Sequence, residues 1–83
     1  MKVRYFAWVR ERIGLEEETI EVPGNVATVS DLIGWLSERD EGYAAAFAEP
    51  EVIRVAIDQT HVEHDEPIGR ASEIAFFPPM TGG

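Results

Sequence analysis

The chain has 83 residues, of which 45% are hydrophobic and 28% are charged, and its formal net charge is −9. This length and mix fit one small globular domain that has room for a single core but not for a deep, self-contained active site. The acidic charge argues against nucleic-acid and anionic-membrane binding, and the lack of any cysteine excludes disulfides, zinc–thiolate sites and thiol nucleophiles.

No stretch approaches the roughly 18 consecutive apolar residues of a membrane span. The first residues, Met1-Lys2-Val3-Arg4-Tyr5, lack the apolar stretch of a signal peptide. We therefore expect a cytoplasmic protein that does not bind membranes.

The first predicted element is a strand over residues 3–9, which are rich in β-branched and aromatic side chains. Gly14 marks a loop after it. Residues 18–22 alternate polar and apolar side chains and end at Pro23-Gly24, which predicts a second strand. A short loop between the two strands would make a hairpin.

A helix follows. Thr28 and Asp31 have the spacing of a capping box, with Asp in place of the usual Glu. The apolar residues then recur every three or four positions and predict one buried stripe: Val29, Leu32, Ile33 and Leu36. Residues 40–42 are expected to end this helix, and residues 43–48 predict a second, short one that Pro50 closes.

The last third of the chain predicts three strands. Residues 52–57 form the first, a turn over 58–60 leads to a short strand over 61–63, and residues 73–77 form the last strand before Pro78. The order is β-β-α-β-β-β. It indicates an α+β fold in which one main helix packs on one face of a small mixed sheet.

One helix covers only one face of such a sheet, and side chains alternate between the two faces of a strand. The aliphatic sets belong under the helix: Val3 with Tyr5, Ile53 with Val55 and Ile57, and Ile74 with Phe76. The opposite face, here called the open face, then carries Phe6, Phe77, Ala56 and Ala75 beside Arg4 and Arg54, with His61 at its rim. Aromatic residues and arginine are enriched at interface hot spots, so we expect a docking surface for another protein.

The chain ends in Pro78-Pro79-Met80-Thr81-Gly82-Gly83. The two prolines favour a stiff, extended start, and the two glycines give a thin backbone that can enter a narrow pocket. A terminal carboxylate reacts with nucleophiles only after activation, for example as an acyl-adenylate, and sulfide would convert it to a thiocarboxylate. The alternative is that Gly-Gly is a frayed end without chemistry.

The chain resembles the ubiquitin-like sulfur carriers, and in particular the small subunits of molybdopterin synthase. The resemblance runs from end to end, and its most specific part is the closing run. It is carried by Phe6-Ala7-Trp8-Val9-Arg10-Glu11, Thr28-Val29-Ser30-Asp31-Leu32, Val55-Ala56-Ile57-Asp58-Gln59 and Glu73-Ile74-Ala75-Phe76-Phe77-Pro78-Pro79-Met80-Thr81-Gly82-Gly83. The resemblance implies a β-grasp fold in which the first and last strands pair at the sheet centre, with Phe6 near Phe77.

The resemblance also implies a reaction pathway. An adenylating enzyme akin to a ubiquitin-activating enzyme would use ATP to form an acyl-adenylate at Gly83, and a sulfurtransferase would convert it to a thiocarboxylate. The carrier would then insert its tail into the large synthase subunit, within a heterotetramer. There the sulfur would attack a cyclic pyranopterin monophosphate precursor, and two transfers would build the dithiolene of molybdopterin.

These expectations assign a role to each part of the chain. Residues 1–77 would form the β-grasp domain and residues 78–83 the tail. Gly83, with Gly82, would carry the chemistry, and the sequence contains no glycine-rich phosphate loop. We therefore expect no stand-alone catalytic site and no cofactor bound by this chain alone. The expected partner contacts are Phe6, Phe77, Arg4, Arg54, Pro78, Pro79, Met80 and Thr81.

Other interpretations stay open. A related carrier for tRNA thiolation or thiamine synthesis, or a ubiquitin-like protein modifier, would keep the tail and change the client. A plain β-grasp binding module with an inert tail is an alternative of another class. Residues 61–66 hold two histidines and three acids, but nothing obvious elsewhere supplies a further fixed ligand, so we expect no metal site.

Overall fold

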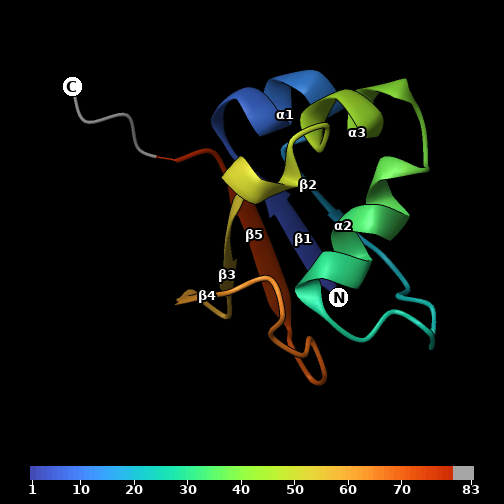
Figure 1. Ribbon diagram of the computed structural model, residues 1–83, viewed down its shortest axis with the longest axis vertical. Helices are drawn as coiled ribbons and strands as arrows, with labels where there is room; N and C mark the ends of the chain where they lie inside the picture. Colours follow the sequence, from blue (N-terminus) through green and yellow to red (C-terminus); the bar gives the residue numbers. More distant parts are fainter. Residues whose placement is uncertain (80–83) are drawn as a thin grey trace.

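The computed structural model describes residues 1–79, and within them the strands form a mixed five-stranded sheet in the order β2-β1-β5-β3-β4 (Figure 1). The elements in chain order are β1 (Lys2–Tyr5), α1 (Ala7–Ile13), β2 (Glu17–Thr19), α2 (Val29–Ser37), α3 (Glu41–Ala46), the 3-10 turn η1 (Pro50–Val52), β3 (Arg54–Ile57), β4 (Thr60–Val62) and β5 (Glu73–Phe77).

The centre of the sheet is the pair of β1 and β5. The two strands run parallel, with Val3 opposite Ile74 and Tyr5 opposite Phe76. Their outer neighbours are antiparallel, β2 beside β1 and β3 beside β5. The first and last strands thus lie side by side at the sheet centre, which confirms the expected β-grasp arrangement and the α+β class.

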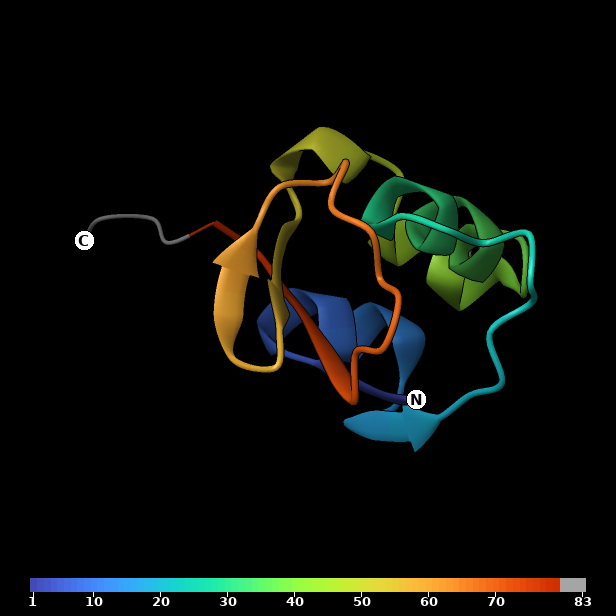
Figure 2. The same cartoon turned by 90° about the horizontal axis from the view of Figure 1, so that it is seen from below.

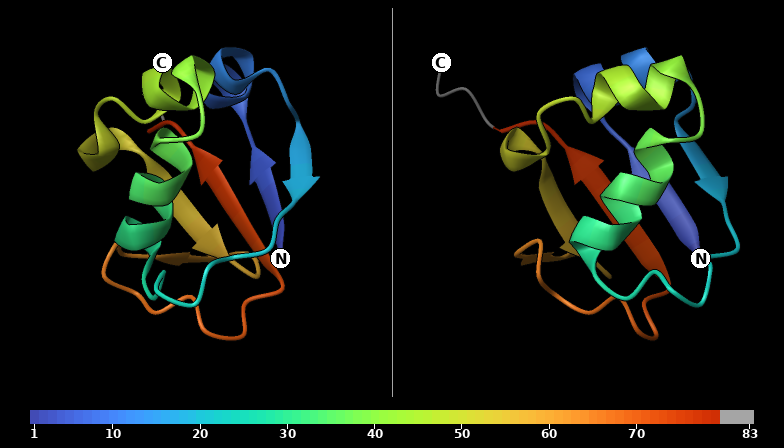
Figure 3. Two further views of the ribbon diagram at one scale, coloured as in Figure 1. Left: turned by 90° about the vertical axis from the view of Figure 1, so that its right-hand side faces the viewer. Right: turned by 45° about the vertical axis from the view of Figure 1, so that its right-hand side comes forward.

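Helix α2 lies across one face of the sheet, while α1 and α3 lie at the end towards which β5 runs (Figure 3). Helix α2 begins with the expected capping box. Thr28 Oγ1 accepts from the Asp31 N–H at 3.2 Å, and Asp31 Oδ2 accepts from the Thr28 N–H at 3.2 Å. The expected apolar stripe is buried at all four positions. Capping and stripe together fix where the helix begins and which side faces the sheet.

The core lies between α2, α3 and the covered face of the sheet. Phe76 is its central aromatic residue: its ring stacks on Tyr5 with centroids 6.3 Å apart and meets Phe47 edge-on at 5.2 Å. Burying a side chain of this kind contributes about 1.5–3 kcal/mol. The residues that alternation predicted for the covered face share the core: Val3, Val55 and Ile74 from the strands, and Ile53 just before β3.

The predicted strand over residues 3–9 is wrong after Tyr5. The chain turns at Ala7, which has a φ of 52°, and forms α1 with Val9 fully buried. Gly14, with a φ of 88°, ends the helix and donates its N–H to the Arg10 carbonyl at 2.7 Å. The connection from β1 to β2 therefore contains a helix rather than the short loop of a hairpin.

The other boundaries shift by one to three residues, and the strand expected over residues 18–22 is shortened to β2, Glu17–Thr19. Asp40, expected to end a helix, begins α3, because its Oδ1 accepts from the N–H groups of Gly42 and Tyr43. The short helix expected over residues 43–48 therefore starts and ends two residues earlier. β3 begins at Arg54 rather than residue 52, because η1 occupies residues 50–52. β4 starts one residue early, and β5 has the predicted bounds.

Two long connections are held together at the end of the molecule near the N-terminus (Figure 2). Ala27 accepts at its carbonyl from the Ile68 N–H at 2.9 Å, and Glu66 accepts from the Val29 N–H at 3.0 Å. These bonds fix the start of α2 against the segment that leads into β5.

Candidate docking face

The side of the sheet away from α2 is the open face, and the strand registers show which residues meet on it. On β5, Ala75 lies opposite Arg4 of β1, and Phe77 lies opposite Arg54 of β3. The alternation of side chains places these four residues on one side. The expected grouping of Arg4, Arg54 and Phe77 is confirmed.

Phe6 joins this face although it is not in a strand. It is the residue before α1, and its backbone N–H donates to the Phe76 carbonyl at 3.1 Å, so it extends the pairing of β1 with β5. Its side chain is 36% exposed. Only two large hydrophobic side chains in the described part of the chain are that exposed, and the other is Leu15.

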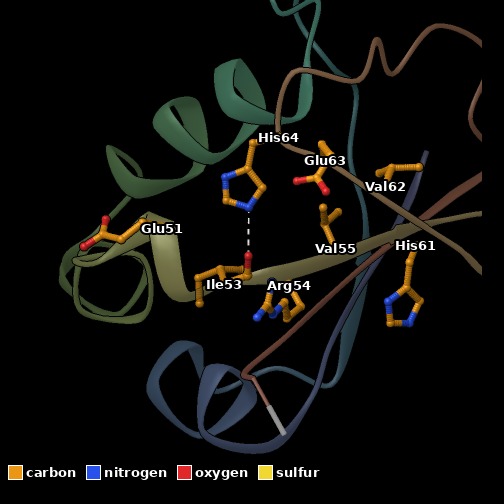
Figure 4. A pocket seen from close by; sticks show the side chains of 8 residues that line it. All are labelled: Glu51, Ile53, Arg54, Val55, His61, Val62, Glu63 and His64. Atoms are coloured by element: carbon orange, nitrogen blue, oxygen red, sulfur yellow. Dashed lines mark hydrogen bonds between the residues drawn. The ribbon is translucent and has the colours of Figure 1, made fainter.

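His61 completes the aromatic part of the open face. It lies on β4 opposite Ala56, and its ring meets Phe77 at 5.2 Å with an interplanar angle of 62°. Arg54 and His61 point to the same side of β3 and β4, with Val55 and Val62 on the other (Figure 4). The placement of His61 on the docking face agrees with the sequence interpretation.

Arg4 is held in a fixed position. Its guanidinium lies over the Phe6 ring at 5.1 Å from the centroid, and its Nε lies 4.0 Å from Glu17 Oε1. The same Glu17 carboxylate contacts Lys2 Nζ at 3.1 Å through its other oxygen. Sequence reasoning missed Glu17, although its alternation with Glu18 on β2 could have placed it on the open face.

A groove adjoins the open face where β3 and β4 separate. Its volume is about 460 Å³. The ladder between the strands ends at Val62, and beyond it the Nε2 of His64 lies 2.8 Å from the Ile53 carbonyl, so that a ring N–H donates in place of a backbone N–H. The lining residues are Glu51, Ile53, Arg54, Val55, His61, Val62, Glu63 and His64 (Figure 4).

A cluster of polar groups supports the sheet from the side of α3. Glu18 Oε2 accepts from the hydroxyls of Tyr5 at 2.8 Å and Tyr43 at 2.5 Å, and its Oε1 contacts Arg39 at 3.1 Å. Burial and the hydrogen bond to Glu18 raise the pKa of Tyr43 to about 12. Burial raises the pKa of the Glu18 carboxyl, but the bonds from Tyr43, Tyr5 and Arg39 outweigh it and hold that pKa below its usual value.

The tail begins at the edge of the open face. Pro78 and Pro79 follow β5 directly and are partly exposed. The other four predicted tail residues, Met80, Thr81, Gly82 and Gly83, lie outside the described residues.

Within residues 1–79, no group of three or more His, Asp or Glu side chains is placed to hold a metal ion. The helices of that part are also too short and too polar to cross a bilayer.

Comparison with protein families gives one match over almost the whole chain: the model of the ThiS family matches residues 3–83. Among curated proteins, the molybdopterin synthase sulfur carrier subunit of Escherichia coli (strain K12) is 36% identical over 83 residues. That alignment covers 100% of this chain and 99% of the relative.

The chain also resembles solved structures of small proteins over almost its whole length. A putative molybdopterin converting factor, subunit 1, from Pyrococcus furiosus superposes with a TM-score of 0.73 at 31% identity, covering 95% of both chains. The small archaeal modifier protein 1 of H. volcanii superposes with a TM-score of 0.71 at 25% identity, covering 96% of this chain and 97% of that one.

Proposed function

The chain belongs to the ThiS family, and we propose that it is the sulfur carrier subunit of a molybdopterin synthase. The observation that carries this proposal is its end-to-end similarity to the Escherichia coli protein of that name. The likeness to the Pyrococcus furiosus structure supports it. A cytoplasmic location is part of the proposal.

The reactive group in this proposal is the carboxylate of Gly83. An adenylating partner joins it to the α-phosphate of ATP and releases pyrophosphate. A sulfurtransferase then supplies sulfur to the acyl carbon, AMP leaves, and a thiocarboxylate remains. The chain contains no cysteine, so the transferred sulfur would sit on the backbone terminus rather than on a side chain.

In the synthase, the thiocarboxylate sulfur would attack a cyclic pyranopterin monophosphate and form a thioester. Water would then cleave the acyl–sulfur bond, which leaves the sulfur on the pterin and returns the Gly83 carboxylate. Two such transfers build the dithiolene. We propose a heterotetramer, in which the large subunit holds the precursor and this chain supplies the sulfur. ATP is bound by the adenylating partner, and this chain alone binds no cofactor.

The position of the tail relative to the open face supports this division of work. β5 ends at Phe77, which lies on the open face, and Pro78 and Pro79 follow at once. A partner that docks on Phe6 and Phe77 would therefore receive the tail at a fixed place. Met80, Thr81 and Gly82 would then thread towards the partner's catalytic centre.

The decisive measurement is the intact mass of the protein after incubation with ATP, the adenylating enzyme and a sulfur donor. We expect a species heavier by one oxygen-to-sulfur exchange, and none when Gly83 is deleted. Gly24→Ala is the matched control, because a Cβ at that position meets no other atom within 4 Å. An unmodified wild-type mass, or sulfur incorporation by the deletion variant, would contradict the proposal.

A second candidate is a protein modifier, which the likeness to the small archaeal modifier protein 1 favours. A modifier would pass the activated Gly83 carbonyl to lysine amines instead of accepting sulfur. Mass spectrometry of the same reaction with added protein substrates distinguishes the two. Isopeptide products without molybdopterin formation would favour the modifier, and carriers for tRNA thiolation or thiamine synthesis would give a thiocarboxylate but no molybdopterin.

An inert binding module is the alternative of another class. In that case deletion of Gly83 would leave partner binding and every activity unchanged. The mass measurement above excludes this alternative if the wild type acquires sulfur.

A further inference from the structure

The open face carries two arginines although the molecule as a whole is acidic, and Glu17 lies next to one of them. The chain carries a net charge of −9, yet Arg4 and Arg54 stand on the strands at either side of β5. Arg4 lies opposite Ala75 and Arg54 opposite Phe77, so the two arginines stand diagonally across β5. Phe6 lies beside Arg4 and Phe77 beside Arg54, so each aromatic residue of the face has one cation next to it.

Arg4 is positioned but its hydrogen-bonding groups are not used. Its Nε is covered from solvent and has no hydrogen-bond partner among residues 1–79. The nearest carboxylate oxygen, on Glu17, is 4.0 Å away, which is beyond hydrogen-bond distance. Stacking on Phe6 nevertheless fixes the guanidinium, and its side chain is 35% exposed. Little rotamer entropy is left to lose when a carboxylate binds it.

Arg54 is equally available. Its side chain is exposed, and it forms no ion pair with any residue that the structure describes. It lines the groove together with Glu51 and Glu63, and Figure 4 shows it on the side of β3 away from Glu63 and His64. Arg54 therefore faces an approaching partner without an ion pair to the described residues, and Arg4 presents the part of its side chain that stays exposed.

From this geometry, and resting on the proposed function, we propose that the open face selects a large synthase subunit whose apolar pocket lies between two carboxylates. Phe6 and Phe77 would fill the pocket, while Arg4 and Arg54 would each pair with one carboxylate. The two arginines are then the specificity-determining residues of the docking face.

Two physical effects make this selection work. A purely apolar partner would bury both guanidinium groups without partners, and leaving a charge unpaired in an interface is strongly unfavourable. A partner with two carboxylates would be repelled by this acidic molecule as a whole but attracted to the two arginines. The charge pattern would therefore orient the encounter as well as stabilise the complex.

The test measures binding to the large molybdopterin synthase subunit of the same organism by titration calorimetry at low and high salt. We expect Arg4→Gln and Arg54→Gln each to weaken binding by about tenfold or more, and the double variant to lose most of its salt dependence. Arg70→Gln is the matched control: it removes an exposed arginine from the loop before β5 and should change the affinity by less than about twofold. Thermal unfolding of each variant checks that the fold is intact.

Lysine substitutions separate charge from geometry. Arg4→Lys and Arg54→Lys keep the charge but lose the planar fork that binds a carboxylate through two hydrogen bonds. We expect them to keep the salt dependence and to recover only part of the lost affinity.

The possible failures can be told apart. If Phe77→Ala weakens binding while the two Gln variants bind like the wild type at both salt concentrations, the face docks through apolar contacts and the inference about the carboxylates is overturned. The proposed function would stand in that case, since it is read from molybdopterin formation by the thiocarboxylated protein. If the wild type neither binds the large subunit nor supports that reaction, both proposals fall.

Discussion

The Tyr43 hydroxyl of α3 donates to the Glu18 carboxylate of β2 across 2.5 Å. The same oxygen also accepts from Tyr5 of β1, and Arg39 closes the cluster between α2 and α3. Strands β1 and β2, helix α3 and the connection between α2 and α3 thus meet at one carboxylate, whose side chain is only 15% exposed. This cluster fixes α3 against strands β1 and β2.

Glu18→Gln should lower the free energy of unfolding by about 2 kcal/mol, because hydrogen bonds to a charged acceptor contribute about 1.5–3 kcal/mol and the amide is neutral. Urea unfolding measures the loss. Glu17→Gln, a neighbour on the opposite side of β2 with a side chain 45% exposed, should change stability by less than about 0.5 kcal/mol. Equal effects of the two substitutions would show that the cluster has no special role.

Stability should fall in acid partly through Glu18. Its pKa in the folded protein lies below the ordinary value of 4.5, so its stabilising contribution is complete above that value and is lost as the pH falls through the folded pKa. Unfolding measured between about pH 6 and pH 3 should show a steep loss for the wild type and a shallower one for Glu18→Gln. The same slope in both proteins would contradict the assignment.

At alkaline pH the protein should lose stability as the pH rises. Tyr43 has its pKa raised from 10.0 to about 12, so the folded state favours the neutral phenol. Its contribution is complete below pH 10 and is lost as the pH rises through about 12. Tyr43→Phe should show a smaller loss over this range, and ultraviolet titration of the tyrosinate in the folded wild type should give a late transition for Tyr43.

The two helical glycines should respond oppositely to alanine. A Cβ at Gly42 would lie 2.7 Å from the Arg12 carbonyl oxygen, where α3 approaches α1, whereas a Cβ at Gly34 would meet nothing within 4 Å. We expect Gly42→Ala to lower the free energy of unfolding by about 1–3 kcal/mol and Gly34→Ala to raise it by about 1 kcal/mol. Thermal or urea unfolding of the matched pair tests this, and a stabilising Gly42→Ala would exclude a tight contact.

Ala7 offers a test of the turn before α1. Because its φ is 52°, a residue without Cβ adopts this conformation with less strain. Ala7→Gly should leave stability unchanged or raise it by up to about 1 kcal/mol, while Ala44→Gly, at an exposed position inside α3, should lower it by about 1 kcal/mol. Equal losses in both variants would argue against the strained turn.

Patterns with a strong period were predictable from the sequence. The stripe from Val29 to Leu36 and the capping pair of Thr28 and Asp31 placed α2 correctly, and period-two alternation placed Arg54 and Phe77 on the open face. In both cases the signal is local, since each residue's neighbours along the chain determine which side it presents.

The parts that were not predictable depend on distant contacts. Residues 7–13 contain Trp8, Val9 and Ile13, which favour strands, yet Val9 is buried in a helix that packs against α3. No glycine marks the left-handed turn at Ala7. Phe6 was placed on the correct face, but as the residue before a helix rather than as a strand residue. The Glu18 cluster joins residues of β1, β2, α3 and the connection between α2 and α3, so no single stretch of sequence reveals it.

The parallel pairing of β1 with β5 also has a consequence for how the protein is made. The middle of the sheet is incomplete until Phe77 has left the ribosome, because β5 separates β1 from β3. Nascent chains that stop early lack the strand that joins the two halves of the molecule. The open face is likewise assembled only in chains that extend through residue 77, because Arg54 and Phe77 meet only when β5 pairs with β3.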